Sequence, residues 1–459
     1  MNNKLTICFP IEIKQRELFS KLYLSYLLLK TKKIDIVIGD KKYFFIDYEK
    51  SKNLIFFYKG GGKHLLNLFK SVSKNNYIFN LDEEGPISMM SSMDHKLKVN
   101  NQINTYIHKI ILWGENDKKI YETRKCYEKK KTYILGHPKL DLLKKPYLKL
   151  FKKEYESINK NFKKFIFIVS HYTVDNVIQD ENYYLYVQNL YSQKKDKIKK
   201  IISDEKNKYS KFVQLIKKIA EKNPNKQFIF RPHPGQDLNK VIKSFGNLPK
   251  NLKIILKYSV TPWIIACDHY IHAGCTTVFE AEKLKKKITY ISNLDKFDFI
   301  WSNIGYKFYI RDEDKILSFF KKDIKVPKIN NPKKINAVVK NINKEYEFGK
   351  NFVNMLKKEN YLQKKSSLHM RNYDLKKNYI KYFLSHIKTN VLKIRIIARL
   401  AAHYISDFVL TKKLKDSKFY KCNRNELIKI LLLFTRLDNS NIKFKVSKLN
   451  DYVFKISIR

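Results

Sequence analysis

Two short motifs in the second half of the chain carry the residue types of a phosphate-binding site. The first is Arg-Pro-His-Pro at 231–234, which follows the apolar run 227–230 and places His233 where a strand is expected to leave its sheet. The second is 272–282, in which Gly274 permits a tight turn before a predicted helix. A helix start offers unpaired backbone N–H groups and the positive end of the helix dipole. Each motif alone also fits an ordinary proline-bounded turn or a capped helix. Together they favour a nucleotide at the carboxyl edge of a parallel sheet.

The side chains at these two turns define a candidate nucleotide site. A positioned imidazole and the donors of a helix start can bind a phosphate and stabilise the charge that develops on it as it leaves. His233 is therefore also a candidate catalytic residue. The residues that we predict to bind the nucleotide and its phosphate are Arg231, His233, Gly274, Cys275, Thr276, Thr277 and Glu280.

A third motif is acidic and lies in the first half of the chain. Asp82, Glu83 and Glu84 precede Gly85 and directly follow the apolar run 76–81. Because adjacent carboxylates repel one another, we expect at least one of them to keep a raised pKa. A carboxylate in a cleft between two domains is a suitable general base for a sugar hydroxyl, which makes Glu84 and Glu83 candidate catalytic residues. A helix-capping cluster and an acidic metal-binding patch are the alternatives.

The elements that must position these motifs follow an alternating pattern. Short apolar runs alternate with helical stretches, such as 16–30 and 203–222, and a charged connector near 150–162 divides the pattern in two. This alternation predicts an α/β fold with two Rossmann-type, doubly wound halves, residues 1–150 and 160–330. The predicted strands are 4–10, 34–39, 54–58, 76–81, 109–114, 132–136, 164–170, 227–230, 252–256, 270–272 and 288–291.

The remainder of the chain, residues 331–459, is predicted to be a helical, basic extension. Within it, Tyr379–Val409 mixes apolar with basic residues, a pattern typical of a helix that lies on an anionic membrane surface. A helix that packs back on the first half fits the pattern equally well. Residues 416–459 are expected to form a small appended unit.

Composition limits the classes of function. The 94 Lys and Arg residues exceed the 43 Asp and Glu residues, for a formal net charge of +51. Such a charge attracts polyanions or an anionic membrane face. The basic residues are spread along the chain, however, without zinc-ligand spacing, an RNA-binding signature or a stretch patterned for a nucleic-acid groove. We therefore expect a solvated surface with weak membrane attraction and no nucleic-acid partner.

The expected compartment is the cytoplasm, with peripheral attachment to the inner face of the membrane. The chain has no window of 18 uncharged apolar residues and no signal peptide. No Asp-X-Asp motif follows a strand, so we expect no obligatory metal, and no motif indicates a cofactor. The cysteines lack metal-ligand spacing and fit reduced thiols; they are Cys8, Cys126, Cys267, Cys275 and Cys422.

The order of the three motifs resembles that of bacterial sialyltransferases with the GT-B fold. These enzymes have an acidic-acidic-Gly turn, then a His-Pro after a strand, then a Ser/Thr pair at a helix start. The resemblance implies that Glu84 is the base for the acceptor hydroxyl and that His233 contacts the phosphate of a CMP-activated sugar. It also implies that Thr276 and Thr277 hold the same phosphate.

More closely, the chain resembles the bacterial surface carbohydrate biosynthesis protein family. The matching stretches occur in order within residues 5–300, so the resemblance does not cover the C-terminal part. His137 departs from the pattern, since the turn reads Gly-Asn-Pro-Arg in the family, and this puts a role for residues 136–139 in doubt. The matching stretches are 9–18, 81–85, 135–143, 230–234 and 272–282.

The GT-B layout also implies where an acceptor would enter. A charged set directly after the first predicted strand faces the same edge of the cleft as the acidic turn. An exposed helix start explains this set as well as acceptor binding does. The predicted acceptor-side residues are Glu12, Arg16, Glu17 and Gly85.

The resemblance implies a metal-independent GT-B glycosyltransferase of surface polysaccharide or lipopolysaccharide biosynthesis. Two Rossmann-type domains would face a cleft, and the donor would be a CMP-linked nonulosonate or Kdo-type sugar. The acceptor would be a glycan or a lipid-linked glycan. Three alternatives remain open: a CDP-glycerol-type polyol-phosphate transferase, a UDP-sugar 2-epimerase and a non-catalytic partner in glycan assembly.

Overall fold

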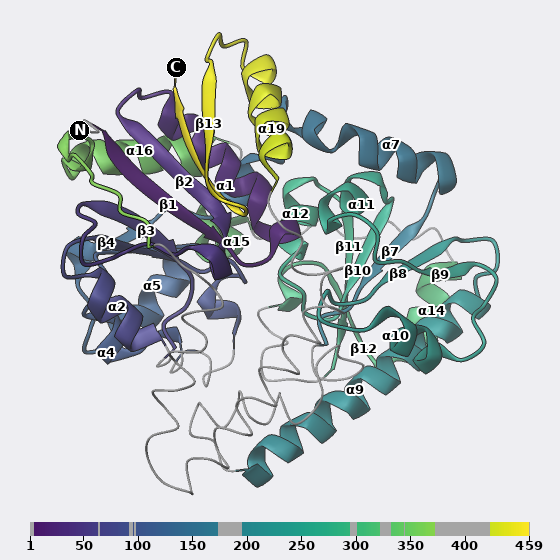
Figure 1. The fold of residues 1–459 in the computed structure, drawn as a ribbon. Coiled ribbons are helices and arrows are strands. Elements are labelled where there is room, and N and C mark those ends of the chain that lie inside the picture. The colour runs from purple at the N-terminus through teal and green to yellow at the C-terminus, as the bar shows by residue number, and fades with distance from the viewer. Residues whose placement is uncertain are drawn as a thin grey trace, which may run out of the picture.

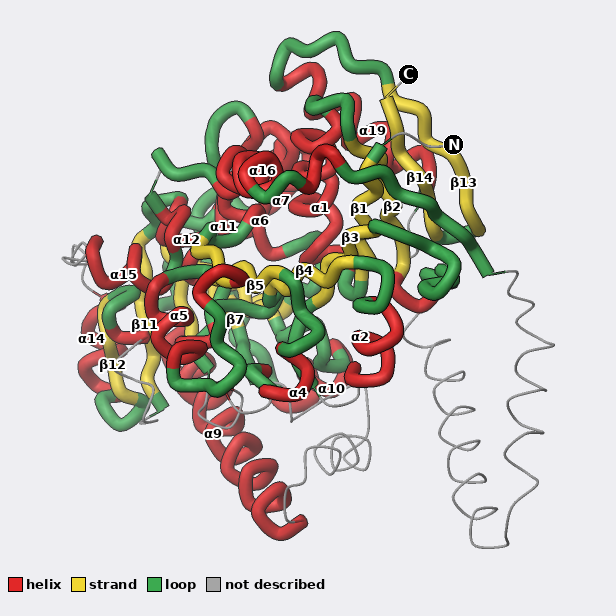
Figure 2. The backbone as a smooth tube through the Cα atoms, turned by 90° about the vertical axis from the view of Figure 1, so that its left-hand side faces the viewer, coloured by secondary structure: helices red, strands yellow, loops and turns green. Residues whose placement is uncertain are grey.

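The computed structural model contains two β-sheets that lie side by side, each with helices packed on it (Figures 1 and 2). The predicted α/β class with two parallel, doubly wound sheets is confirmed. The structure describes residues 4–62, 65–90, 95, 98–172, 195–293, 301–321, 332–343, 345–371 and 423–458.

The first sheet has six parallel strands in the order β2-β1-β3-β4-β5-β6. Every residue of the three neighbouring strands β1, β2 and β3 is buried. Parallel strands covered on both faces read as continuous apolar runs, which explains why these strands were predicted well. The strands are β1 (Leu5–Ile11), β2 (Ile34–Asp40), β3 (Leu54–Tyr58), β4 (Tyr77–Leu81), β5 (Lys109–Leu112) and β6 (Thr132–Ile134).

The second sheet is also parallel, in the order β12-β11-β10-β7-β8-β9. Strand order reverses between β7 and β10, and in the first sheet it reverses between β1 and β3. Ligands of open α/β sheets bind at the carboxyl ends of the strands beside such a reversal. The strands are β7 (Ile166–Val169), β8 (Phe228–Arg231), β9 (Leu252–Ile254), β10 (His269–His272), β11 (Lys287–Ser292) and β12 (Tyr306–Tyr309).

Helices connect the strands and cover the sheets, and α7 leads from the first half to the second, where it packs against α11. The first-half helices are α1 (Lys14–Leu29), α2 (Leu66–Val72), α4 (Asn101–Asn104), α5 (Glu115–Glu122) and α6 (Pro138–Asp141), followed by α7 (Lys152–Asn161). The second-half helices are α9 (Lys195–Glu221), α10 (Leu238–Phe245), α11 (Val260–Ala266), α12 (Val278–Lys283) and α14 (Glu313–Lys321). Beyond them lie α15 (Pro332–Val338), α16 (Phe348–Lys358) and α19 (Arg424–Leu437).

The C-terminal part returns to the first half. Strand β14 (Val453–Ile458) pairs antiparallel with β2, and β13 (Phe444–Asn450) pairs antiparallel with β14, so the first sheet has eight strands. Helices α16 and α19 both pack on α1 (Figure 1). Phe434 of α19 stacks on Tyr26 of α1, with ring centroids 5.6 Å apart.

The prediction of a helical extension over residues 331–459 agrees with α15, α16 and α19 but is wrong at β13 and β14, which are strands of the first sheet. The prediction of a separate unit over 416–459 is wrong for residues 423–458. Their apolar residues, such as Phe454 and Ile456, are buried against the first half. The predicted membrane-surface helix, Tyr379–Val409, lies outside the described residues.

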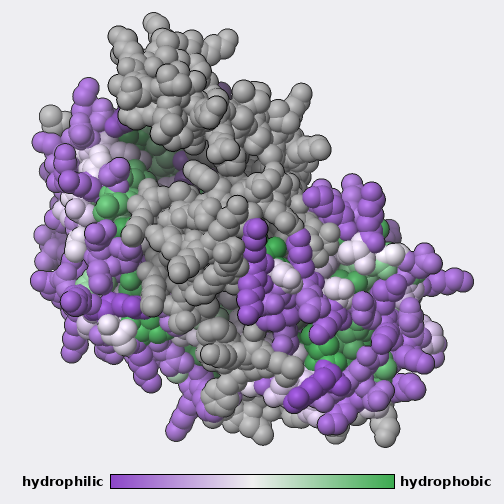
Figure 3. Space-filling model, turned by 90° about the horizontal axis from the view of Figure 1, so that it is seen from below, coloured by the Kyte–Doolittle hydropathy of each residue, from purple (hydrophilic) through white to green (hydrophobic). Residues whose placement is uncertain are grey.

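The described surface seen from below is mostly hydrophilic, and its hydrophobic residues lie in small separate patches (Figure 3). Within the ranges that the structure describes, no helix is both long enough and apolar enough to cross a membrane.

Candidate active site

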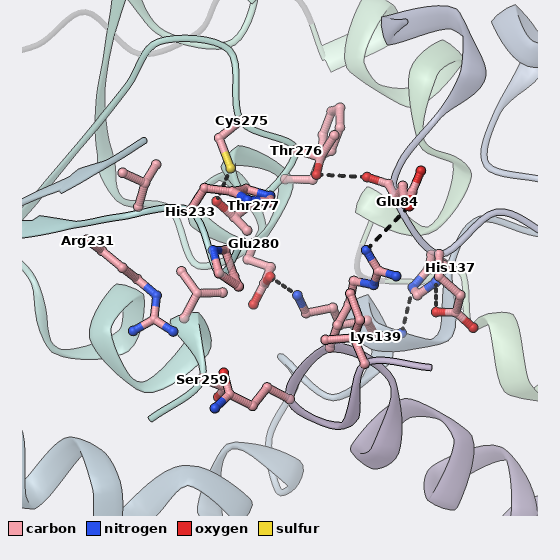
Figure 4. A pocket seen from close by; sticks show the side chains of 18 of the residues that line it. Glu84, His137, Lys139, Arg231, His233, Ser259, Cys275, Thr276, Thr277 and Glu280 are labelled. Carbon is pink, nitrogen blue, oxygen red and sulfur yellow. Dashed lines mark hydrogen bonds and ion pairs between the residues drawn. The ribbon is translucent and has the colours of Figure 1, made fainter. Parts of the chain in front are cut away.

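A cavity of about 420 Å³ lies between the two halves, where the carboxyl ends of both sheets meet (Figure 4). Residues that follow β1, β4, β5 and β6 line it on one side, and residues that follow β7, β8 and β10 line it on the other. Both strand-order reversals therefore border the same space. The first half contributes Ile13, Gln15, Arg16, Glu83, Glu84, Trp113, His137, Lys139 and Leu140. The second half contributes Val169, Ser170, Arg231, Pro232, His233, Pro234, Ser259, Val260, Cys275, Thr276, Thr277, Phe279 and Glu280.

His233 lies where the sequence predicts it, directly after β8, and its side chain projects into the cavity (Figure 4). Its Nδ1 accepts a hydrogen bond from the Gly235 N–H at 3.0 Å. A neutral imidazole that accepts at Nδ1 carries its proton on Nε2. The turn therefore fixes the ring as a donor through Nε2.

Arg231 is buried, and its guanidinium donates to the carbonyl oxygens of Lys257 and Tyr258 at 3.0 and 2.7 Å. Burial lowers its pKa to about 10. The side chain thus holds the loop that leads to Ser259 at the wall of the cavity. These bonds use two of the five N–H donors of the guanidinium, so its role as a phosphate ligand stays a prediction.

The turn after β10 has the predicted tight geometry, with Gly274 at a φ of +115°. The Thr277 hydroxyl is 2.7 Å from the Tyr270 hydroxyl and 3.0 Å from the Cys275 sulfur, so it is used within the turn. The Thr276 hydroxyl donates to the backbone oxygen of Glu84 at 3.0 Å. The turn thereby contacts the acidic turn of the other half.

Glu83 is buried and held on both carboxylate oxygens. Oε2 is 3.0 Å from His137 Nε2, and Oε1 is 3.5 Å from Lys21 Nζ. Burial raises the pKa of Glu83, but Lys21 and His137 outweigh burial and hold the pKa well below its ordinary value of 4.5. The Glu83 carboxylate therefore stays charged and is not available to an acceptor.

Glu84 points into a group of cations. Its carboxylate pairs with Lys98 at 2.8 Å, with Lys59 at 3.2 Å and with Arg16 at 3.8 Å, and its side chain is 45% exposed. Burial of the carboxyl raises its pKa, but these cations outweigh burial and lower it well below 4.5. The predicted raised pKa is therefore wrong for both Glu83 and Glu84, because each carboxylate has cationic neighbours that the local sequence does not reveal.

His137 occupies the position that the sequence left in doubt. It follows β6, stacks on Trp113 with ring centroids 4.4 Å apart, and is almost fully buried. Its Nδ1 accepts from the Lys139 N–H at 3.2 Å, so Nε2 carries the proton that it donates to Glu83. His137 thus connects the acidic turn to the turn that carries Lys139.

Of the four predicted acceptor-side residues, Arg16 and Gly85 lie at the cavity, whereas Glu12 and Glu17 bind other parts of the protein. Arg16 lines the cavity, and Gly85 lies at its edge with a φ of +146°, where a Cβ would come within 2.4 Å of Thr276. Glu12 pairs with Lys59 at 3.0 Å. Glu17 is buried and accepts from the N–H groups of residues 12 and 13, so it stabilises the start of α1 and does not line the cavity.

Direct contacts at the cavity and beside it hold the halves together. Besides the Thr276 to Glu84 hydrogen bond, Lys139 Nζ forms an ion pair with Glu280 (Figure 4). Lys283 Nζ donates to the backbone oxygens of residues 341–343, and Asn341 in turn donates to the His137 carbonyl at 2.8 Å.

Lys139 was not among the predicted site residues. The only sequence signal was its place in a Gly-His-Pro-Lys turn that parallels the His-Pro turn of the second half. Among the described residues, no group of three or more His, Cys, Asp or Glu side chains is arranged to hold a metal ion. Metal independence of any reaction stays a prediction.

Comparisons with known proteins support the fold. No protein-family model and no curated protein matches the chain. Among solved structures, UDP-GlcNAc 2-epimerase from Methanocaldococcus jannaschii is 16% identical and has a TM-score of 0.50, covering 77% of this chain and 99% of the epimerase. The GT-B-like fold, with two Rossmann-like units, is thereby confirmed.

Two further structures are similar at lower scores. S. aureus MnaA in complex with UDP is 11% identical with a TM-score of 0.47, covering 80% of this chain and 99% of that chain. The wall teichoic acid polymerase TagF is 10% identical with a TM-score of 0.46, covering 79% and 89%.

Proposed function

We propose that the protein is a glycosyltransferase of surface glycan biosynthesis that transfers a sugar from a nucleotide donor. The observation that carries the proposal is the cavity itself. It brings the His233 turn and the turn at 274–277 together with the acidic turn at 82–85. A transferase needs a donor site and an acceptor base within contact of each other, and the Thr276 to Glu84 hydrogen bond joins the two motifs directly.

The charges that line the cavity are balanced within the protein. Among the described lining residues, three cations stand with three carboxylates, and each cation has a protein partner: Arg16 with Glu17 and Glu84, Lys139 with Glu280, and Arg231 with two carbonyl groups. A diphosphate would bring about two negative charges into this balanced site. A CMP-linked nonulosonate or Kdo-type sugar also brings two, one at its phosphodiester and one at its carboxylate. The preference for such a donor is therefore supported by the motif order that resembles the bacterial sialyltransferases, and not by the charge of the cavity.

Glu84 is the proposed base for the acceptor hydroxyl. Its side chain reaches the cavity and is half exposed, whereas Glu83 is enclosed by His137 and Lys21. Since its pKa is lowered, Glu84 is a carboxylate at neutral pH and can accept a hydrogen bond from a hydroxyl in any buffer near pH 7. Its cationic neighbours Lys59 and Lys98 would fix its orientation.

The proposed setting is the cytoplasmic face of the membrane, where a lipid-linked glycan acceptor would be presented. Two features support it: the net charge of +51 and the basic, apolar stretch at 379–409. Both would attract the protein to anionic lipid.

The test combines nucleotide binding with product analysis. Thermal shifts with equal concentrations of CMP, CDP, UDP and GDP should show the largest stabilisation with CMP, because a ligand that binds the folded state more tightly stabilises it more. A preference for CDP would favour a polyol-phosphate transferase. Conversion of UDP-GlcNAc to its 2-epimer without acceptor would instead show an epimerase. A protein stabilised by none of the four nucleotides would contradict the proposal.

A further inference from the structure

Two cations that line the cavity, Arg16 and Lys139, come from the half opposite the predicted donor site, and Lys139 pairs with a residue of that site. Lys139 belongs to α6 in the first half, and its Nζ pairs with Glu280 of α12 in the second (Figure 4). The Lys139 side chain is 19% exposed, whereas that of Glu280 is 3% exposed. The ammonium group thus faces the cavity, and the carboxylate lies buried behind it.

Glu280 is itself held in place. Its Oε2 accepts a hydrogen bond from the Thr261 hydroxyl at 2.6 Å, within α11 and α12 of the second half. Turning this carboxylate towards a ligand would break a buried hydrogen bond, and its charge would repel a phosphate. The predicted contact between Glu280 and a phosphate is therefore unfavourable. The carboxylate is placed to fix the position of the Lys139 ammonium.

Lys139 has donors to spare. An ammonium group has three N–H donors, and within the described part of the chain Glu280 is the one acceptor paired with Nζ. Lys139 also lies near the turn after β10: burial raises the pKa of the Cys275 thiol, and the charge of Lys139 acts against that rise. Cys275, Lys139 and His233 line the same cavity.

We propose that Lys139 binds the phosphate of the nucleotide donor from across the cleft, with Glu280 as its positioning residue. This rests on the proposed function, since it takes the phosphate to lie beside His233 and Cys275. One ammonium would then contact a carboxylate of the second half and the ligand at once. Donor binding would strengthen the link between the two halves.

The experiment compares CMP with cytidine, which lacks the phosphate, in calorimetric titrations of the full chain. Lys139→Ala should lower CMP affinity about tenfold or more, the range for a hydrogen bond to a charged group, and leave cytidine affinity within about twofold. Lys139→Arg should restore most of the loss. Lys144→Ala is the matched control, because Lys144 pairs with Glu347 outside the cavity and its loss should leave CMP affinity unchanged.

A second set of titrations, with Glu280→Gln, tests whether Glu280 positions Lys139. If Glu280 acts through Lys139, the single variant should lose less CMP affinity than Lys139→Ala, and the double variant should match Lys139→Ala. Unchanged CMP affinity in a folded Lys139→Ala protein overturns the inference, as does an equal loss for CMP and cytidine. If the wild-type protein binds neither CMP nor the other nucleotides, the proposed function fails and this inference fails with it. Wild-type CMP binding that survives Lys139→Ala overturns only the inference.

Discussion

The two histidine turns at the cavity, His137-Pro138 in the first half and His233-Pro234 in the second, share one local hydrogen bond. In each, Nδ1 accepts the N–H of the residue two positions further on, so Nε2 carries the proton. In the first half that proton is donated to the buried Glu83. In the second half the ring projects into the cavity.

The difference shows that the same turn can place its imidazole inside the protein or at a cavity. His137 faces a buried carboxylate and is enclosed by Trp113, so it stabilises the acidic turn. His233 follows a strand of the other sheet and lines the cavity between the two halves. A His-Pro motif therefore does not by itself indicate a ligand contact.

The largest expected effect tests the acidic turn that His137 supports. Glu84→Gln should reduce transfer by about 10²–10⁴, the usual cost of losing a general base, and leave nucleotide binding nearly intact. Initial rates and thermal shifts with CMP measure both. Glu83→Gln is the matched variant: it removes the charge beside Lys21 and should lower the free energy of unfolding. Loss of transfer in a stable Glu83→Gln protein, with Glu84→Gln active, would show that the base is Glu83.

The second prediction separates the two histidines. His233→Ala should lower turnover by about 10²–10³ and weaken nucleotide binding, because a phosphate leaving group loses a positioned donor. His137→Ala should instead lower the free energy of unfolding by about 1.5–3 kcal/mol, since Glu83 loses a buried hydrogen bond. Urea unfolding and steady-state rates distinguish these outcomes. If His233→Ala lowers stability and His137→Ala lowers only turnover, the roles assigned to the two histidines are wrong.

The third prediction concerns the loss of folding stability at acidic pH. Burial lowers the pKa of His269 and of His272 to about 3 each. Both are neutral in the fold and charged at pH 5 when unfolded, so the unfolded state binds more protons and stability falls as pH drops below about 6.5. Between pH 6.5 and 5, each histidine should cost about 2 kcal/mol. Urea titrations at pH 7 and pH 5 measure this, and His269→Gln should reduce the difference. Equal free energies of unfolding at both pH values would show that these two histidines do not have lowered pKa values in the fold.

The smallest expected effect is on membrane binding, which we assign to the basic stretch at 379–409 and not to the two described halves. Each Lys or Arg near an anionic leaflet adds roughly 1 kcal/mol of attraction. Binding to liposomes should therefore rise with anionic lipid and fall with salt. Deleting residues 379–409 should weaken sedimentation with liposomes and leave CMP binding in place. Full liposome binding by this variant would assign the attraction to the rest of the surface.

The sequence predicts the interior of the fold well and its margins poorly. The run Leu54–Tyr58 is predicted residue for residue, because a strand buried on both faces is apolar throughout. β12, β13 and β14 are missed, since lysines interrupt their apolar residues. β14 in particular owes its strand state to a pairing with β2, more than 400 residues earlier in the chain.

The candidate site divides in the same way. His233 and Gly274 are found because their chemistry is local to a turn. Arg231 and Glu280 are placed at the cavity, but their partners are carbonyl groups and Lys139, which no local pattern discloses. Glu17 is an exception, because the Lys four positions later already indicates an i,i+4 pair on one helix face.

The pairing of β14 with β2 has a consequence for synthesis. A chain leaves the ribosome from its N-terminus, and domains generally fold as units once all their residues have emerged. All six strands of the second sheet lie between residues 166 and 309, so that sheet can assemble while the ribosome is still adding residues. The first sheet begins to form earlier but is complete only when residues 453–458 have been added. Until then the edge of β2 has unpaired N–H and C=O groups that can pair with a strand of another chain. The half that is made first is thus the half that is finished last.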